Sequence, residues 1–297
     1  MMFAALVSIK LAMATLIMSI GMGSSLADVT YLLRRPALLA RSLVAMYVLV
    51  PLVTFAMVEL LPLGTGVKAA LLVLAVSAGA PLLPRKLQEF GDSAYGFSLV
   101  IVSSLLAIVL TPLWVALLAR YFGVAAELSW RAAASAISIA FLAPLVAGMG
   151  LGALFPAFTA HWATRLSTLA AVVLAVASAV LLAGNWQVLA GIRPLGIVAL
   201  LATMTIALAI GHLSGGPDEG DRTTLAIACS TRHLGIAVII ATTFQGPRTI
   251  VILASYVIAS TLVSVPYLRW RRRRCAASRH DSTRPAPAAP DNATPKT

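Results

Sequence analysis

Nine apolar blocks, each close to the length that crosses a lipid bilayer, dominate this chain of 297 residues. A transmembrane helix needs about 20 consecutive apolar residues to span a hydrocarbon core of about 30 Å. Only 11% of the residues are charged and 60% are hydrophobic, which excludes a water-soluble domain of this size. The blocks lie near residues 3–27, 37–61, 67–90, 93–119, 131–154, 165–185, 193–213, 221–244 and 248–268. We therefore predict an all-α, multi-pass membrane protein with nine transmembrane helices.

The basic residues predict the orientation of these spans. Connectors on the cytoplasmic side of a membrane protein are enriched in Lys and Arg. With the N-terminus outside, the inner connectors hold Arg34, Arg35, Arg41, Arg85, Lys86, Arg165, Arg222 and the arginines of the C-terminal tail. The outer connectors then hold only Lys68, Arg120, Arg131, Arg193 and Arg248. We predict a plasma or inner membrane protein with its N-terminus outside and its C-terminus in the cytoplasm.

The two ends of the chain differ in character. Lys10 lies within the first apolar run rather than before it, which favours a retained span over a cleaved signal peptide. Residues 1–268 form the predicted transmembrane domain, and residues 269–297 form a basic and then disordered tail. The tail's arginines directly follow a span, so they indicate contact with anionic lipid rather than with nucleic acid. The acidic residues Asp218, Glu219 and Asp221 are predicted to lie in a solvated loop.

Two of the nine blocks are abnormal. The third, LLVLAVSAGAPLLPRKLQEFGD, is interrupted by Pro81 and Pro84, which cannot continue a regular helix. The eighth, LAIACSTRHLGIAVIIATT, carries Arg232 and His233 in its middle, although an Arg at the centre of a membrane helix costs about 2.5–3.5 kcal/mol. Broken segments at membrane depth are tolerated only inside protein or along a cavity. Two such segments, one in each half of a chain, indicate a transporter binding site.

Several stretches together resemble the bile acid:sodium symporter family. They are GMGSSLADVTYLLRRP at 21–36, VPLV at 50–53, SAGAPLLPRKLQEFGDSAYGFSL at 77–99, SSLLAIVLTPL at 103–113 and STRHLGIAVIIAT at 230–242. The resemblance implies two inverted repeats with a crossed pair of discontinuous helices, which would be blocks three and eight. It also implies that this chain lacks the first helix, as nine-helix members of the family do.

The family's sodium ligands do not carry over to this sequence. In register with the family pattern, Leu82 and Leu83 occupy the positions of the Ser-Asn pair, and Gly96 and Val100 occupy those of the helix-four hydroxyls. Ala228 occupies the position of the Glu, and Arg232 and His233 occupy those of the Gln-Asn pair. Sodium prefers several oxygen ligands, and these side chains supply almost none. We therefore predict no metal site and no cofactor, with sodium coupling through backbone carbonyls and hydroxyls as the alternative.

The candidate site residues each have a structural and a functional interpretation. Arg232 either holds the helix together or acts as a fixed cation that replaces sodium or binds an anionic substrate. His233 is either a hydrogen-bonding core residue or a proton carrier, and Ser230 and Thr231 either cap unwound backbone or contact substrate. The remaining candidates are Pro81 and Pro84 at the first break, Arg85 and Lys86 after it, and Ser103 and Ser104 in the next span.

These observations predict a secondary transporter that moves a small or amphipathic organic anion by alternating access. Its partners would be that anion and the lipid bilayer. A non-transporting membrane sensor or an intramembrane enzyme is the alternative from another class. The sequence contains no paired-carboxylate, HExxH, GxSxG or phosphate-loop motif, so we predict no catalytic residues and no enzyme activity.

Overall fold

The computed structural model describes residues 2–79, 93–123, 130–244 and 246–282, and every regular element within them is a helix. Within these residues, seven helices are long and apolar enough to cross a bilayer, in agreement with the predicted multi-pass membrane protein. These spans are Phe3–Gly23, Pro36–Leu60, Ala94–Tyr121, Ala134–Leu154, Pro156–Gly184, Pro194–Ser214 and Val251–Arg274. The third and eighth predicted spans do not form single long helices. The total of nine spans therefore stays a prediction.

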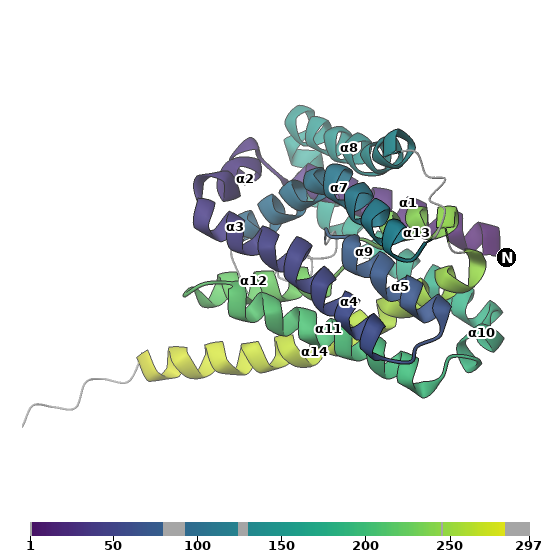
Figure 1. Cartoon of the computed structure of the whole chain (residues 1–297). Helices are drawn as coiled ribbons and strands as arrows, with labels where there is room; N and C mark the ends of the chain where they lie inside the picture. The colour runs from purple at the N-terminus through teal and green to yellow at the C-terminus, as the bar shows by residue number, and fades with distance from the viewer. Residues whose placement is uncertain (1, 80–92, 124–129, 245, 283–297) are drawn as a thin grey trace, which may run out of the picture.

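Figure 1 labels the helices along the chain. The first half comprises α1 (Met2–Gly23), α2 (Leu26–Tyr31), the 3-10 helix η1 (Leu32–Arg34), α3 (Pro36–Val44), the π-helix η2 (Ala45–Leu49), α4 (Val50–Leu60), α5 (Thr65–Val76) and α7 (Ser93–Tyr121). The second half comprises α8 (Trp130–Leu154), α9 (Pro156–Gly184), α10 (Trp186–Ala190), α11 (Pro194–Ser214), α12 (Glu219–Ser230), α13 (Leu234–Phe244) and α14 (Gly246–Ser282).

Glycines allow α1 to pack closely against α8. A β-carbon on Gly21 would overlap the carbonyl oxygen of Leu145, and one on Gly148 would overlap the carbonyl oxygen of Met18. Small residues at such contacts let two backbones approach, which is how helices associate where lipid supplies no hydrophobic driving force. The two long helices α8 and α9 both pack against α1. In the sequence, only Phe155 separates α8 from α9.

The start of α9 differs from the prediction. The sixth span was expected from residue 165, but α9 begins at Pro156, in the first-turn position where the missing N–H of proline is harmless. Arg165 therefore lies inside α9 rather than in an inner connector, and its guanidinium lies 5.5 Å from the ring centroid of Trp162. A hydropathy window underestimates this end because polar and aromatic residues continue the helix.

The C-terminal helix also extends beyond the predicted span. α14 continues to Ser282, so the basic cluster that follows residue 268 is helical. Figure 1 shows the end of α14 projecting away from the other helices. Residues 278–282, which we predicted as part of the disordered tail, belong to this helix, and residues 283–297 lie outside the described part of the chain.

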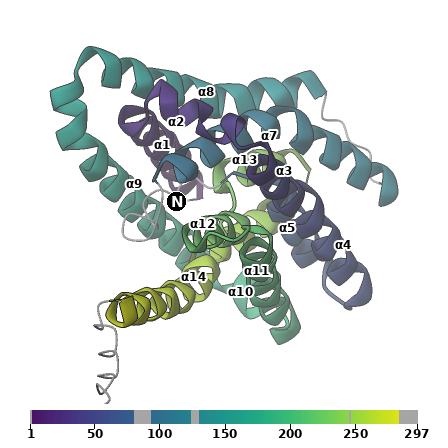
Figure 2. The same cartoon turned by 90° about the vertical axis from the view of Figure 1, so that its left-hand side faces the viewer.

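The core consists of two apolar clusters that meet at the interrupted segments. Buried residues of α12, such as Ala228, belong to one cluster, whereas those of α13, such as Leu234, belong to the other. The segment after α5 changes cluster in the same way between Val76 and Ala78. In the view of Figure 2, α12 and α13 lie near the centre of the bundle. The chain is therefore non-helical where it passes from one apolar cluster to the other.

Candidate functional site

The eighth predicted span is interrupted where the sequence indicated. α12 ends at Ser230, and Thr231 has extended backbone angles (φ −103°, ψ 121°) before α13 begins at Leu234. The side chains of Ser230, Thr231, Arg232 and His233 are all buried. A charged guanidinium and an imidazole are thus enclosed at the junction of two half-helices.

Arg232 has few partners for a buried arginine. Its side chain is 2% exposed, and Nη1 donates to the carbonyl oxygen of Met46 at 3.3 Å. Nε and Nη2 are buried and have no hydrogen-bond partner among the described residues. Its backbone N–H donates to the hydroxyl of Tyr256, whose own O–H lies 3.3 Å from the Arg232 carbonyl oxygen. The described residues form no ion pair with this guanidinium.

Pro51 explains why the Met46 carbonyl is available. In the π-helix η2 the N–H of Val50 donates to Ala45, five residues back, instead of to Met46. The next residue, Pro51, has no N–H to donate to Met46 in the same register. The Met46 carbonyl is therefore free to accept from Arg232. The carbonyl of Tyr47, which a regular helix would pair with residue 51, accepts instead from Nε1 of Trp114 at 3.0 Å.

His233 connects the break to the end of α5. Its backbone N–H donates to the carbonyl oxygen of Ser77 at 3.0 Å, and its ring nitrogen Nδ1 accepts from the N–H of Ile236 at 3.3 Å. A neutral imidazole that accepts at Nδ1 carries its proton on Nε2. That Nε2 atom is buried and has no partner among the described residues. The ring also lies edge-on to Phe141, with centroids 6.3 Å apart.

The segment that follows α5 passes between α7 and this break. Gly79 has φ +112°, and a β-carbon there would lie 3.0 Å from Oγ of Ser104 and 3.4 Å from Cδ2 of His233. Only glycine suits both this backbone angle and this crowding. The Ser104 hydroxyl is buried without a partner in the described residues, whereas Ser103 donates to the Val100 carbonyl at 3.2 Å. The two interrupted segments therefore meet directly at residues 77–79 and 231–233.

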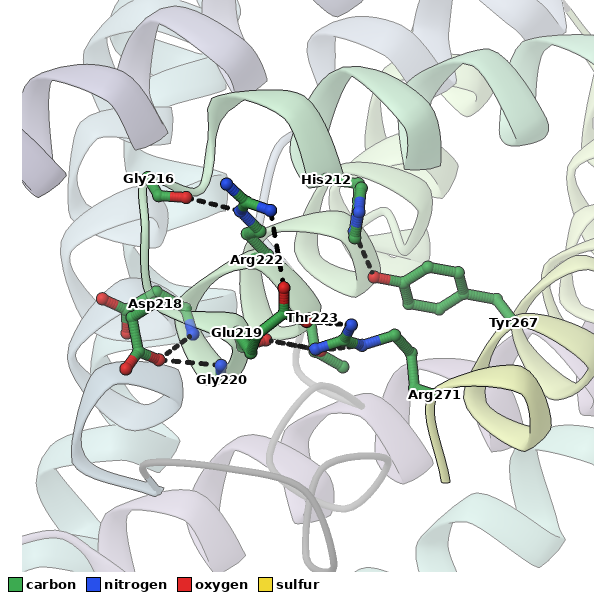
Figure 3. Close-up of polar contacts among 10 residues, drawn as sticks. His212, Gly216, Asp218, Glu219, Gly220, Arg222, Thr223, Tyr267 and Arg271 are labelled. Carbon is green, nitrogen blue, oxygen red and sulfur yellow. Dashed lines mark hydrogen bonds and ion pairs between the residues drawn. The ribbon is translucent and has the colours of Figure 1, made fainter. Parts of the chain in front are cut away.

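A second polar cluster joins the start of α12 to α11 and α14 (Figure 3). Asp218 caps α12 by accepting from the N–H groups of Gly220 and Asp221. Glu219 forms an ion pair with Arg271, whose Nε donates to Thr223 at 2.8 Å. The predicted loop at 218–221 is wrong, because Asp218 caps α12 and Glu219, within that helix, fastens it to α14. Asp218 and Glu219 are nevertheless exposed, as predicted.

The electrostatics of this cluster are asymmetric. Arg271 is 2% exposed, but the Glu219 side chain is 59% exposed and also lies 3.5 Å from Nη1 of Arg222. The hydrogen bond from Arg271 lowers the pKa of Glu219, and the charges of both arginines act in the same direction. His212 in α11 completes the contact through its Nδ1, 2.9 Å from the hydroxyl of Tyr267 in α14.

Comparison with known proteins assigns the chain to a family of transporters. A model of the Sodium Bile acid symporter family matches residues 10–192, which is more than half of the chain. The chain belongs to this family. No protein with a curated description matches the chain significantly. The family match ends before α12, so the break at 231–233 lies beyond the matched residues.

Several positions that the family resemblance linked to sodium are apolar or small here. Gly96, Val100 and Ala228 are buried, and the last two belong to an apolar cluster. Leu82 and Leu83 lie outside the described residues, as do the predicted site residues Pro81, Pro84, Arg85 and Lys86. The described part of the chain contains no group of three His, Cys, Asp or Glu side chains that could hold a metal ion.

Several contacts of the break were not predicted from the sequence. Tyr256 contributes a hydroxyl from α14, Ser77 contributes a carbonyl, and Met46 contributes the only described partner of the Arg232 side chain. A tyrosine within an apolar span was one available signal. The other was Pro51, whose effect on preceding carbonyls is local and can be deduced from the sequence.

Proposed function

We propose that this member of the Sodium Bile acid symporter family transports a small or amphipathic organic anion by alternating access, with Arg232 as the fixed cation of the substrate site. One observation carries the proposal: a buried guanidinium with two N–H-bearing nitrogens that no described residue accepts from. Buried polar groups are almost always paired, so unpaired donors at one place require an explanation. A carboxylate or sulfonate would accept from both nitrogens as a planar fork.

Neighbouring groups support an anion rather than a cation. Nε2 of His233 is a second buried donor, and the Ser104 hydroxyl close to the same ring is a third buried polar group without a described partner. The half-helix α13 begins at Leu234, so its positive dipole end adds a favourable potential for negative charge. Sodium would meet repulsion from Arg232 at the same place. We therefore infer transport that does not require sodium.

An apolar cavity lined by the two half-helices α5 and α13 supports an amphipathic substrate. The cavity has a volume of about 330 Å³ and lies between α5, α7 and α13. Val76 and Ile240 line the cavity and belong to the two interrupted segments, while Lys68 supplies a cation in its lining. Apolar walls with a few placed polar groups are typical of organic-ligand sites. An apolar body in this cavity and an anionic group at Arg232 would suit one molecule.

The proposed setting is the plasma or inner membrane, with the N-terminus outside and the C-terminus in the cytoplasm. The seven long apolar helices support the membrane setting, and the predicted orientation rests on the distribution of basic residues. Neither a membrane sensor nor an intramembrane enzyme is supported by a specific feature of the described site.

Uptake into proteoliposomes tests the proposal. A panel of radiolabelled organic carboxylates, sulfates and sulfonates is offered with and without an inward sodium gradient. We expect saturable uptake of at least one amphipathic anion that is equal in both conditions. Arg232→Gln should abolish it, and Arg232→Lys should retain part of it because the charge remains but the fork is lost. Arg120→Gln, an exposed arginine at the end of α7, is the matched control. Sodium-driven uptake that Arg232→Gln leaves intact would refute the proposal.

A further inference from the structure

A second pocket lies near the start of α12, at the opposite end of this helix from the break. An open pocket of about 700 Å³ lies between α3, the end of α11 and the turn that leads into α12. Its charged lining residues are Arg41 and Arg222, and no acidic residue lines it. The apolar lining residues are Ala40, Val44 and Leu213. Under the predicted orientation this pocket opens on the cytoplasmic side.

The two arginines flank a single glycine. Nε of Arg222 donates to the carbonyl oxygen of Gly216 at 2.5 Å, a contact visible in Figure 3. A β-carbon on Gly216 would lie only 2.9 Å from Nη1 of Arg41, so the second guanidinium rests against the same residue. Like charges repel at this range, and an anion held between them is stabilised by both. The turn that brings them together requires the φ of +86° that Gly216 adopts.

Nearby acidic residues bind mainly to groups outside the pocket. Asp218 directs its carboxylate at the N–H groups that begin α12, at 2.7 and 3.0 Å. Glu219 shares its carboxylate between Arg271 and a long contact of 3.5 Å with Arg222. The described residues form no ion pair with Arg41. The pocket therefore retains a positive charge despite the acidic start of α12.

Exposed apolar side chains border the pair of charges. Leu213 is 83% exposed and Val44 is 47% exposed, although both lie in helices long enough to span the membrane. In a membrane chain such side chains contact acyl groups rather than water. A free phosphate ion would use only the arginines, whereas a phospholipid would use the arginines and this apolar edge together.

We propose that this pocket binds an anionic phospholipid, with the phosphate between Arg41 and Arg222 and an acyl chain along Val44 and Leu213. Basic pockets between transmembrane helices on the cytoplasmic side bind anionic headgroups through charge-assisted hydrogen bonds. The bound lipid bridges α3 to the α11–α12 turn, and α12 leads directly to the break. This site is independent of the substrate site, and its test does not depend on transport.

Native mass spectrometry of the purified full chain tests the site. The protein in a zwitterionic detergent is titrated with phosphatidylglycerol, with phosphatidylcholine, or with inorganic phosphate alone. We expect phosphatidylglycerol to bind about tenfold more tightly than phosphatidylcholine. Arg41→Gln should weaken phosphatidylglycerol about fivefold, as expected for one basic residue at a membrane surface. Arg34→Gln removes an exposed arginine on the same predicted side and should leave the affinity within twofold.

Four results would overturn the proposal. Equal loss with Arg34→Gln and Arg41→Gln would show general surface attraction, and no loss with either would show that the pocket is not used. Inorganic phosphate that binds alone and displaces phosphatidylglycerol would identify a free-anion site instead. If Arg41→Gln lowers the unfolding temperature without lipid, Leu213→Asp replaces it, since Leu213 is exposed and its substitution leaves both arginines in place. Unchanged lipid affinity in Leu213→Asp would then reject the acyl contact.

Discussion

Replacing Arg232 by Met separates a binding role from a structural one. Methionine keeps much of the length of the side chain but removes its charge and all its N–H donors. The guanidinium makes one described hydrogen bond, 3.3 Å long, and leaves Nε and Nη2 without partners. A residue selected to hold the fold together would be better satisfied. We therefore expect the substitution to abolish anion binding with little effect on stability.

The expected size of the stability change follows from two opposing contributions. An arginine at the centre of a membrane helix costs about 2.5–3.5 kcal/mol, which Met would relieve. The lost hydrogen bond from a charged donor to the Met46 carbonyl is worth about 1.5–3 kcal/mol. The net change lies between about −0.5 and 2 kcal/mol, where a positive value favours the variant. At about 2 °C per kcal/mol, the unfolding temperature should change by between about −1 and +4 °C.

Cys229 provides the assay. Its thiol is fully buried in α12, two residues before the break, and should become reactive only when this region unfolds. A Cys275→Ser background removes the second of the two cysteines, so a thiol-reactive dye reports Cys229 alone. Arg120→Met is the control for loss of an exposed charge. If Arg232 were needed to hold the fold together, its replacement would cost about 3–5 kcal/mol of stability. The unfolding temperature would then fall by about 6–10 °C, and that result would refute the binding role.

Three further outcomes are expected. Glu219→Gln should remove a pH dependence of the unfolding temperature. Because the pKa of Glu219 is lowered in the folded protein, its carboxylate contributes stability above pH 4.5, and this stability is lost as the pH falls from 4.5 through the lowered pKa. Unfolding temperatures measured from pH 6 to pH 3.5 check this. Pro51→Ala should restore a regular helix and weaken anion binding several-fold without lowering the unfolding temperature, measured by the anion-induced shift of that temperature. Reporter fusions after Arg35 and Arg274 should both score cytoplasmic, and a periplasmic or extracellular score at Arg274 would contradict the predicted orientation.

The sequence was sufficient to locate the break but not its partners. Arg232 and His233 in an apolar run predicted an interruption, and α12 ends two residues before Arg232. The predicted start of the sixth span, at residue 165, was wrong, because α9 begins at Pro156. Hydropathy detects apolar surface rather than helix continuity, and the first residues of α9 include polar and aromatic side chains. Block three could be followed only as far as Gly79, where the described part of this segment ends.

Long-range pairing explains most of what could not be predicted. Pro51 indicates that carbonyls in the preceding turn lack their usual N–H donors, and this can be deduced from the local sequence. That one of those carbonyls meets Arg232, 186 residues from Met46, depends on how the helices pack. The contact of His233 with Ser77 depends on the packing in the same way. Sequence patterns identify polar groups that need partners, whereas tertiary structure decides which groups meet.

The fixed charge of Arg232 bears on how the proposed transporter would be driven. A sodium ion enters and leaves in each cycle, so its gradient can drive a second solute, but a guanidinium attached to the chain cannot leave and stays charged at any accessible pH. His233 accepts at Nδ1 from Ile236, so a second proton would break that contact and set two buried positive charges side by side. Neither residue therefore suits the carriage of a coupling cation. For the proposed function, the driving force is then the gradient of the organic anion itself, or its exchange against a second anion across the same site.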